Sequence, residues 1–230
     1  MMEKRQKSAV PIKFLEKNNY LTNVIKKSRK ESMSLDKEKL ASSISILMNA
    51  PLITLATFIP LILKFGNGET WNLFFITSFF GCILPLVSVV VLLKMNIIKD
   101  FYATERNERF IPFLTSIFCY LLGTITLIIV QAPAPITALM ACYIINGIVL
   151  ASITLKWKIS IHASGVTSPV TALVYLLGTR LLPLFLLVLP VIWARLELKA
   201  HSKMQLTAGA LLSTALTWIQ MAFYIHYVFI

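Results

Sequence analysis

Six apolar runs follow one another along the chain after a polar N-terminal segment. Each is at least about as long as the 20 residues that an α-helix needs to cross a bilayer. The fifth run is too long for one ordinary span, and Gly178-Thr179-Arg180 interrupts it, which favours a hairpin of two short helices. The runs cover residues 40–63, 72–93, 110–130, 136–155, 166–194 and 206–230. This pattern predicts an all-α fold, a polytopic transmembrane helical bundle of about six or seven helices, of which two are short.

The polar stretches between the runs indicate which helix ends share a face of the membrane. The first two runs form a hairpin, the third and fourth form another, and the halves of the fifth form the last. The N-terminal segment and three polar stretches therefore emerge on one face: 94–109, 156–165 and 195–205. The sequence thus divides into a basic N-terminal segment, 1–39, in which 18–30 can form a short amphipathic helix, and a transmembrane domain, 40–230.

Composition and charge agree with this arrangement. Charged residues make up 14% of the chain and hydrophobic residues 57%, so there are too few charges to cover a water-facing surface. Of the 22 lysines and arginines, only Lys64 and Arg180 lie opposite the N-terminal face. The positive-inside rule predicts that this face is cytoplasmic, in a multi-pass protein of the inner or plasma membrane. No aromatic platform accompanies the basic segment, so the lipid bilayer is the predicted partner and nucleic acid is not.

Similar sets of residues occur in the three stretches on this face. Several cations around one pocket favour a phosphate or diphosphate, because a guanidinium grips two oxygens and an ammonium acts as a point charge. Two histidines can divide the chemistry: one attacks phosphorus, and the other protonates the leaving alkoxide. This scheme needs no metal and no cofactor. The candidates are Lys99, Arg106 and Arg109 in the first stretch, Lys158, Ser160 and His162 in the second, and Arg195, His201 and Gln205 in the third.

The order and spacing of these residues resemble the type-2 phosphatidic acid phosphatase superfamily, whose membrane branch shares its site with vanadium haloperoxidases. That family carries the motifs Lys-x6-Arg-Pro, Pro-Ser-Gly-His and Ser-Arg-x5-His-x3-Asp. Two further patterns resemble a small prokaryotic subgroup: Lys-x-Ser-x-His-Ala-x-Gly from Lys158, and Gln-x3-Gly from Gln205. Across residues 40–230 this sequence has Lys99-x6-Arg106-Asn107, Ile159-Ser160-Ile161-His162 and Ala194-Arg195-x5-His201-x3-Gln205.

The resemblance implies a hydrolase of lipid metabolism and makes 40–230 a transmembrane phosphatase-like domain. It would be a metal-independent membrane phosphatase that hydrolyses a lipid phosphate or a prenyl (di)phosphate through a phosphohistidine intermediate. His201 would be the nucleophile and His162 the general acid. Arg195, Arg106 and Lys99 would hold the phosphate oxygens. Phosphatidate-like lipids, phosphatidylglycerophosphate and prenyl phosphates all stay open as substrates.

Four further residues complete the expected site. Ser160 would donate a hydrogen bond to phosphate, and Gln205 would orient the nucleophilic histidine. Arg109 competes with Arg106 for the role of the first-motif arginine, because a proline lies closer to Arg109. Lys158 is an additional phosphate-binding candidate that has no counterpart in the three motifs.

Three departures from the family pattern support an alternative hypothesis, a catalytically impaired relative that binds lipid phosphate without turnover. Gln205 replaces an Asp and brings no negative charge to a protonated His201. Ile161 replaces Gly, and Asn107 replaces Pro. A membrane prenyltransferase is disfavoured, because it needs paired Asp-rich motifs to hold magnesium and the transmembrane domain has one Asp. The family site commonly faces the outer side, whereas the charge distribution places it inside.

Overall fold

The computed structural model describes residues 33, 35–100 and 105–229. Contacts divide the chain into Met1–Leu40 and Ala41–Ile230, and the second unit contains nearly all of the described helices. The amphipathic helix predicted at 18–30 lies outside the described residues. The described part of the chain is helical and contains no strand, which confirms the predicted all-α fold.

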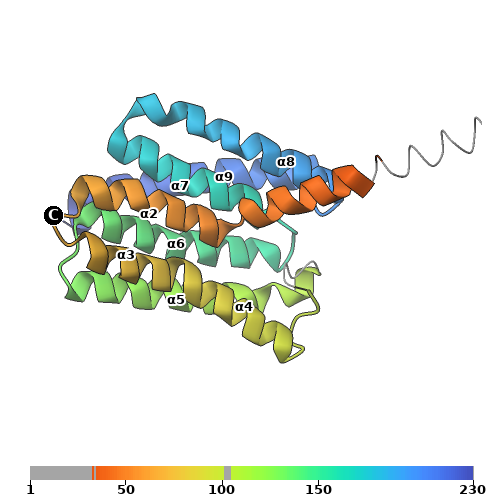
Figure 1. Cartoon of the computed structure of the whole chain (residues 1–230), viewed down its shortest axis with the longest axis horizontal. Helices are drawn as coiled ribbons and strands as arrows, with labels where there is room; N and C mark the ends of the chain where they lie inside the picture. Colours follow the sequence, from red (N-terminus) through yellow and green to blue (C-terminus); the bar gives the residue numbers. More distant parts are fainter. Residues whose placement is uncertain (1–32, 34, 101–104, 230) are drawn as a thin grey trace, which may run out of the picture. The chain divides into compact units, whose positions relative to one another are not determined.

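Helices and short helical turns follow one another along the second unit (Figure 1). The long elements are α2 (Ala50–Phe65), α3 (Thr70–Ser78), α4 (Leu84–Lys94), α5 (Phe110–Ile129), α6 (Ala134–Thr154), α7 (Ile161–Leu177), α8 (Val188–Glu197) and α9 (Lys203–Phe223). A π-helical turn, Phe79–Ile83, joins α3 to α4, and a 3₁₀ segment, Thr179–Leu187, leads into α8. A 3₁₀ turn, Arg106–Glu108, precedes α5, and a π-helical turn, Tyr224–Val228, follows α9.

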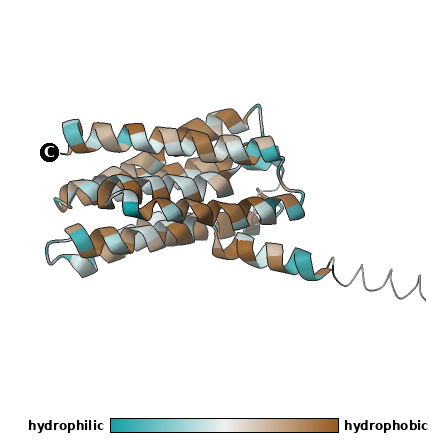
Figure 2. Cartoon of the chain, turned by 90° about the horizontal axis from the view of Figure 1, so that it is seen from above, coloured by the Kyte–Doolittle hydropathy of each residue, from teal (hydrophilic) through white to brown (hydrophobic). Residues whose placement is uncertain are grey.

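Five helical stretches are long and apolar enough to cross a membrane: Thr70–Lys94, Arg106–Ile129, Ala134–Thr154, Thr179–Glu197 and Lys203–Val228. A sixth crossing results if Leu35–Leu47 and Ala50–Phe65, which meet at an angle of 48°, count together as one bent span. Helix α7 is apolar but has only 17 residues. Large apolar side chains such as Leu63, Phe75 and Ile129 point outward, and hydrophilic residues gather at the helix ends (Figure 2). The fold is therefore a helical bundle of the multi-pass membrane type.

The hairpin predicted within 166–194 is present. Helix α7 ends at Leu177, and Gly178 turns the chain with φ of 104°, a conformation that an L side chain rarely adopts. Helix α7 begins at Ile161, however, whereas the sequence predicts a polar connection over 161–165. The side chain of Ser160 accepts a hydrogen bond from the backbone N–H of Ala163, and this cap starts the helix one turn early.

The first predicted span, 40–63, is broken rather than continuous. The helix that reaches Leu47 stops, and α2 restarts at Ala50 with Pro51 in its first turn. A proline is tolerated there because the first N–H groups of a helix have no intrahelical acceptor. Asn49 is the residue before α2, and its side chain makes no capping hydrogen bond. The break therefore places the polar side chain of Asn49 and the first turn of α2 in the interior of the bundle, at one of its ends.

Helix α7 lies in the interior of the unit, where 12 of its 17 residues are buried. It packs against α2 and α9 through small residues. A Cβ on Gly165 would lie 2.6 Å from the Cβ of Ala50, and one on Gly209 would lie 2.6 Å from the carbonyl oxygen of Ser160. The hydroxyl of Ser164 donates to the carbonyl of Gly209 at 3.0 Å. Small residues allow this close approach, as is typical of helix pairs in membranes.

A buried polar network joins α7 to α6 and α9 in the middle of the unit. The amide of Asn146 donates to the hydroxyls of Ser168 and Thr217, both at 2.9 Å. These two hydroxyls share a hydrogen bond of 2.8 Å, and the amide of Gln220 donates to the side-chain oxygen of Asn146 at 2.9 Å. Each of these hydrogen bonds joins two helices in an interior where water is scarce, so the network fixes the register of the three helices.

Replacing Gly209 with alanine tests the α7–α9 contact. The added Cβ would press on a backbone carbonyl, which cannot rotate away, so we expect a loss of about 1–3 kcal/mol of stability and a lower Tm in detergent. Gly81→Ala is the matched control, because its Cβ would meet side chains and no backbone atom, the nearest being the methyl of Thr54 at 3.2 Å. Equal Tm values for the two variants would contradict this packing.

Candidate active site

Four buried polar side chains from different elements meet at one end of the unit. Arg109 precedes α5, His162 lies in the first turn of α7, Arg195 lies in the last turn of α8, and His201 directly precedes the Ser202 cap of α9. Their exposed fractions are 2%, 9%, 3% and 7%. Arg109, His162 and His201 line a cavity of 190 Å³, and Arg195 lies close enough to act electrostatically on both histidines.

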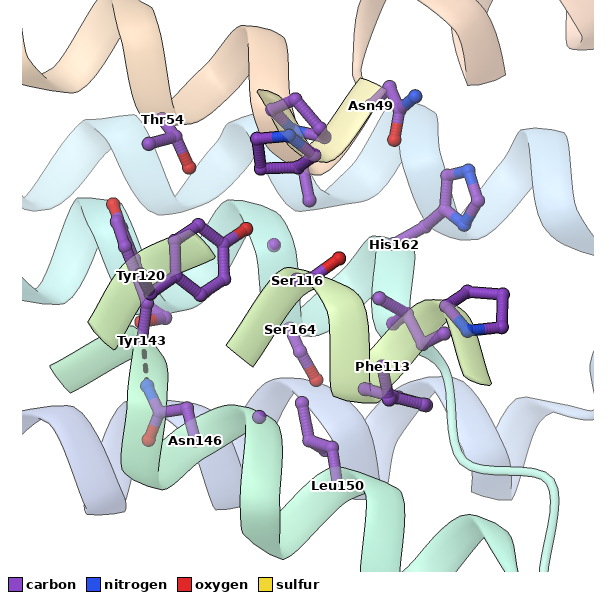
Figure 3. A pocket seen from close by; sticks show the side chains of 18 of the residues that line it. Asn49, Thr54, Phe113, Ser116, Tyr120, Tyr143, Asn146, Leu150, His162 and Ser164 are labelled. Carbon is purple, nitrogen blue, oxygen red and sulfur yellow. Dashed lines mark hydrogen bonds between the residues drawn. The ribbon is translucent and has the colours of Figure 1, made fainter. Parts of the chain in front are cut away.

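The three predicted stretches do emerge together. Figure 1 shows the connections α4–α5, α6–α7 and α8–α9 at one end of the unit, while the C-terminus and the turn at Gly178 lie at the other. The prediction that these three connections lie on the same face of the bundle is therefore confirmed. The cavity starts between them and continues into the bundle (Figure 3).

Local geometry explains how two histidines come to face one cavity. Lys199 has φ of 51°, and the N–H of Ala200 donates to the carbonyl of Arg195, so α8 ends in a Schellman-type turn. This turn brings His201 back beside the end of α8. The N–H of Ser160 donates to the backbone carbonyl of Gln205 at 3.2 Å, which ties the start of α7 to the start of α9.

Burial of the two guanidinium groups requires hydrogen-bond acceptors. Arg109 donates to the carbonyl of Ile159 at 3.4 Å, and Arg195 donates to the hydroxyl of Ser45 at 3.4 Å. Asp100 lies near Arg109 and offsets part of its charge. A buried cation is costly to hold in a low dielectric, so an anion that enters the cavity gains an unusually strong attraction.

The electrostatics set the protonation state of His201. Burial is the largest cause that lowers the pKa of His201 to about 3, followed by the charges of Arg109, Arg195 and Lys158, while the nearby carbonyl of Lys158 acts in the opposite direction. Its Nδ1 has no hydrogen-bond partner among the described residues. Burial, followed by Arg109 and Arg195, also lowers the pKa of the half-buried Lys158. His201 is therefore a neutral imidazole at pH 7, with a lone pair available.

Two residues predicted for the first motif lie elsewhere. The side chain of Lys99 is 80% exposed and pairs with Glu108 at 3.5 Å. Arg106 is exposed and donates to the carbonyl of Lys156 at 2.9 Å. Neither lines the cavity. The exposed 3₁₀ turn carries Arg106 outward, whereas Arg109 lies where α5 begins and points inward, so the structure favours Arg109 of the two predicted alternatives.

The polar atoms of Ser160 and Gln205 cap helices. The hydroxyl of Ser160 accepts from Ala163, although its own proton can still be donated. The side-chain oxygen of Gln205 accepts from the N–H of Ser202, and the Ser202 hydroxyl accepts from the N–H of Gln205. This reciprocal capping box explains why the predicted orienting contact between Gln205 and His201 is not seen. The pattern Ser-x-x-Gln before an apolar run is the signal in the sequence that indicates this cap.

The first span also contributes to the site, which the sequence motifs do not indicate. Ser45, 1% exposed, contacts Arg195, and Asn49 lines the cavity near His162 (Figure 3). Both residues flank the break before α2. The available signal is Pro51, a residue that is tolerated in the first turn of a helix and is compatible with a helix start at Ala50.

Among the described residues, no group of three His, Cys, Asp or Glu side chains is arranged to hold a metal ion. Comparisons of the chain with protein-family models, with curated proteins and with solved structures find no match.

The low pKa of His201 predicts how stability depends on pH. The value of about 3 in the fold lies below the usual 6.5 of an unfolded chain. Between these values the unfolded chain binds a proton that the folded chain excludes, so this contribution to stability is present above about pH 6.5 and is lost as the pH falls towards 3. The Tm of the wild type should therefore fall more steeply over this window than that of His201→Gln. His226→Gln, at an exposed position, is the control, and parallel curves for wild type and His201→Gln would contradict the prediction.

Proposed function

We propose that this protein is an integral membrane phosphatase that removes the phosphate of a lipid phosphate through a phosphohistidine intermediate. One observation carries the proposal: the buried Arg109, His162 and His201 line a cavity that runs between apolar helices, and the buried Arg195 lies close enough to act on both histidines. The order of these residues along the chain supports it, because it resembles the type-2 phosphatidic acid phosphatase pattern. Arg109 takes the role of the first-motif arginine in this proposal.

The first half-reaction forms a bond between nitrogen and phosphorus. The neutral ring of His201 attacks phosphorus, and the P–O bond to the lipid alcohol breaks. Arg109, Arg195 and Lys158 stabilise the charge on the equatorial oxygens. The phosphate raises the proton affinity of the neighbouring imidazoles, so His162 takes up the proton of the bound phosphate monoanion. His162 then donates this proton to the leaving alkoxide.

The second half-reaction releases inorganic phosphate. A water molecule attacks phosphorus, the N–P bond breaks, and His162 accepts the proton that the water gives up. His201 returns to its neutral form, which the surrounding cations favour. His162 returns its proton to the departing phosphate, so each histidine ends the cycle in the state in which it began.

A lipid substrate fits the position of the site. The cations lie at the ends of helices that are apolar along their length, so a phosphate at the level of the headgroups reaches them while its chain stays among apolar side chains. Phe113, Ile117 and Leu150 line the cavity beyond the histidines. This placement supports a phosphorylated lipid over a small soluble phosphate.

One observation favours a second candidate, a relative that binds lipid phosphate without turnover. Gln205 is engaged in the α9 cap, and Nδ1 of His201 has no acceptor among the described residues. A nucleophilic histidine normally gains a large rate advantage from an orienting acceptor. Binding would survive this loss, since the arginines do not depend on it.

Phosphate release in detergent, with EDTA present, separates these candidates. The panel contains phosphatidate, phosphatidylglycerophosphate, a prenyl phosphate and a prenyl diphosphate. We expect wild-type turnover that survives EDTA, and a loss of at least about a thousandfold in His201→Ala, because removal of a nucleophile eliminates the covalent route. His226→Ala is the control and should retain full activity.

Each outcome of this assay favours a different reaction. Full activity in His201→Ala would refute the phosphohistidine mechanism. Binding of a lipid phosphate by a folded wild type that releases no phosphate would favour the second candidate. Loss of turnover in EDTA would indicate a metal-dependent reaction instead.

The charge distribution supports a cytoplasmic location for the end that carries the site. Cysteine labelling in intact cells tests it, because the native Cys82, Cys119 and Cys142 are buried. A membrane-impermeant thiol reagent should label Glu69→Cys, at the opposite end, and spare Lys199→Cys, at the site end. Both positions are exposed. The reverse labelling pattern would place the site on the outer side.

A further inference from the structure

Asn49 stands at the N-cap position of α2 and does not cap the helix. Asparagine is among the residues that most favour this position, because its side-chain oxygen accepts from the first free N–H groups of a helix. The side chain of Asn49 makes no such hydrogen bond. It lines the cavity instead, at the end where His162 lies (Figure 3). The amide is therefore available to a molecule that enters the cavity.

A close contact between α2 and α7 holds Asn49 near His162. A Cβ on Gly165 would lie 2.6 Å from the Cβ of Ala50 and 3.0 Å from its Cα. Gly165 follows His162 by three residues, so the two lie on the same face of α7. That face is consequently packed against the residue that directly follows Asn49. The proximity of the amide to the imidazole thus depends on the packing of two backbones.

This end of the cavity favours negative charge. Ala50 and Pro51 line the cavity as well, so α2 directs its N-terminal end, the positive end of the helix dipole, towards it. The guanidinium of Arg109 lines the same cavity. An amide N–H at this place donates to an oxygen that carries charge. Because the amide is neutral, it contributes a direction to the interaction and adds no further net charge.

Resting on the proposed phosphatase function, we infer that Asn49 is a further catalytic residue, whose amide N–H donates to the oxygen that joins phosphorus to the lipid alcohol. When His201 attacks and the P–O bond breaks, negative charge grows on this oxygen. His162 supplies the proton that the oxygen finally keeps. Asn49 stabilises the charge while the bond is breaking. The arginines act on the equatorial oxygens, whereas Asn49 and His162 together act on the leaving group.

The basicity of the leaving group tests this role. Dodecyl phosphate releases a strongly basic alkoxide, whereas 4-dodecyl-2-nitrophenyl phosphate releases a phenolate that spreads its own charge. In full-length Asn49→Ala we expect kcat/KM for dodecyl phosphate to fall at least about tenfold, the scale of a hydrogen bond to a charged oxygen. For the nitrophenyl ester it should fall much less. The loss should lie in kcat with little change in KM, because the hydrogen bond strengthens only in the transition state.

Two further variants separate this role from a structural one. Asn49→Ser loses the amide but keeps a side chain that caps helices well, so it should show the same substrate-dependent loss and the Tm of the wild type. Asn72→Ala removes an amide from an exposed position that does not line this cavity. It should leave both rates unchanged.

A double-mutant cycle separates direct contact from action through His162. If Asn49 contacts the leaving oxygen, Asn49→Ala should still lower the rate on dodecyl phosphate in a His162→Ala background. A substitution without further effect in that background would show that Asn49 acts only through the imidazole, and would overturn the inference.

The two substrates also distinguish this inference from the function on which it rests. Equal losses on both substrates in Asn49→Ala, or no loss on either, would overturn the role of Asn49 and leave the phosphatase function standing. Failure of the wild type on both substrates would instead refute the phosphatase function.

Discussion

Two positive charges lie buried in the end of a helical bundle, and much of the neighbouring structure is arranged around them. Neither Arg109 nor Arg195 has more than 3% of its surface exposed. The carbonyl of Ile159 and the hydroxyl of Ser45 accept from them, and these acceptors belong to segments far away in the sequence. A cation held in this way is unfavourable by itself and becomes favourable when an anion enters. Under the proposed function, this anion is the phosphate of a lipid.

Helix α7 connects that electrostatic arrangement to the packing of the bundle. Its first turn carries His162, and its contacts with α9 depend on Gly209 and Ser164. The hydrogen bond from Ser160 to the carbonyl of Gln205 joins the segments that carry the two histidines. The spacing between the rings is consequently set by backbone contacts, which are stiffer than contacts between side chains.

The elements of the fold are predictable from the sequence, because a run of about 20 apolar residues has few alternatives in a bilayer. The meeting of the three polar stretches is predictable as well, since it depends only on the number of hairpins. The sequence does not separate Arg106 from Arg109, because both precede the same run and only the 3₁₀ turn decides which faces inward. The capping role of Gln205 can be read from the pattern Ser-x-x-Gln, although the resemblance to the family assigns that residue to His201 instead. The contribution of Ser45 depends on a contact across 150 residues, which no motif indicates.

The length of α7 has a consequence for the environment in which the protein works. Seventeen residues extend over roughly 25 Å, less than the hydrocarbon thickness of about 30 Å of an average bilayer. A helix that is shorter than the membrane places its ends beneath the surface unless the bilayer thins around it. The polar groups at its start, His162 among them, are thereby held at a fixed depth. Under the proposed function, membrane thickness, which varies with chain length and sterol content, then becomes a determinant of how readily a headgroup meets them.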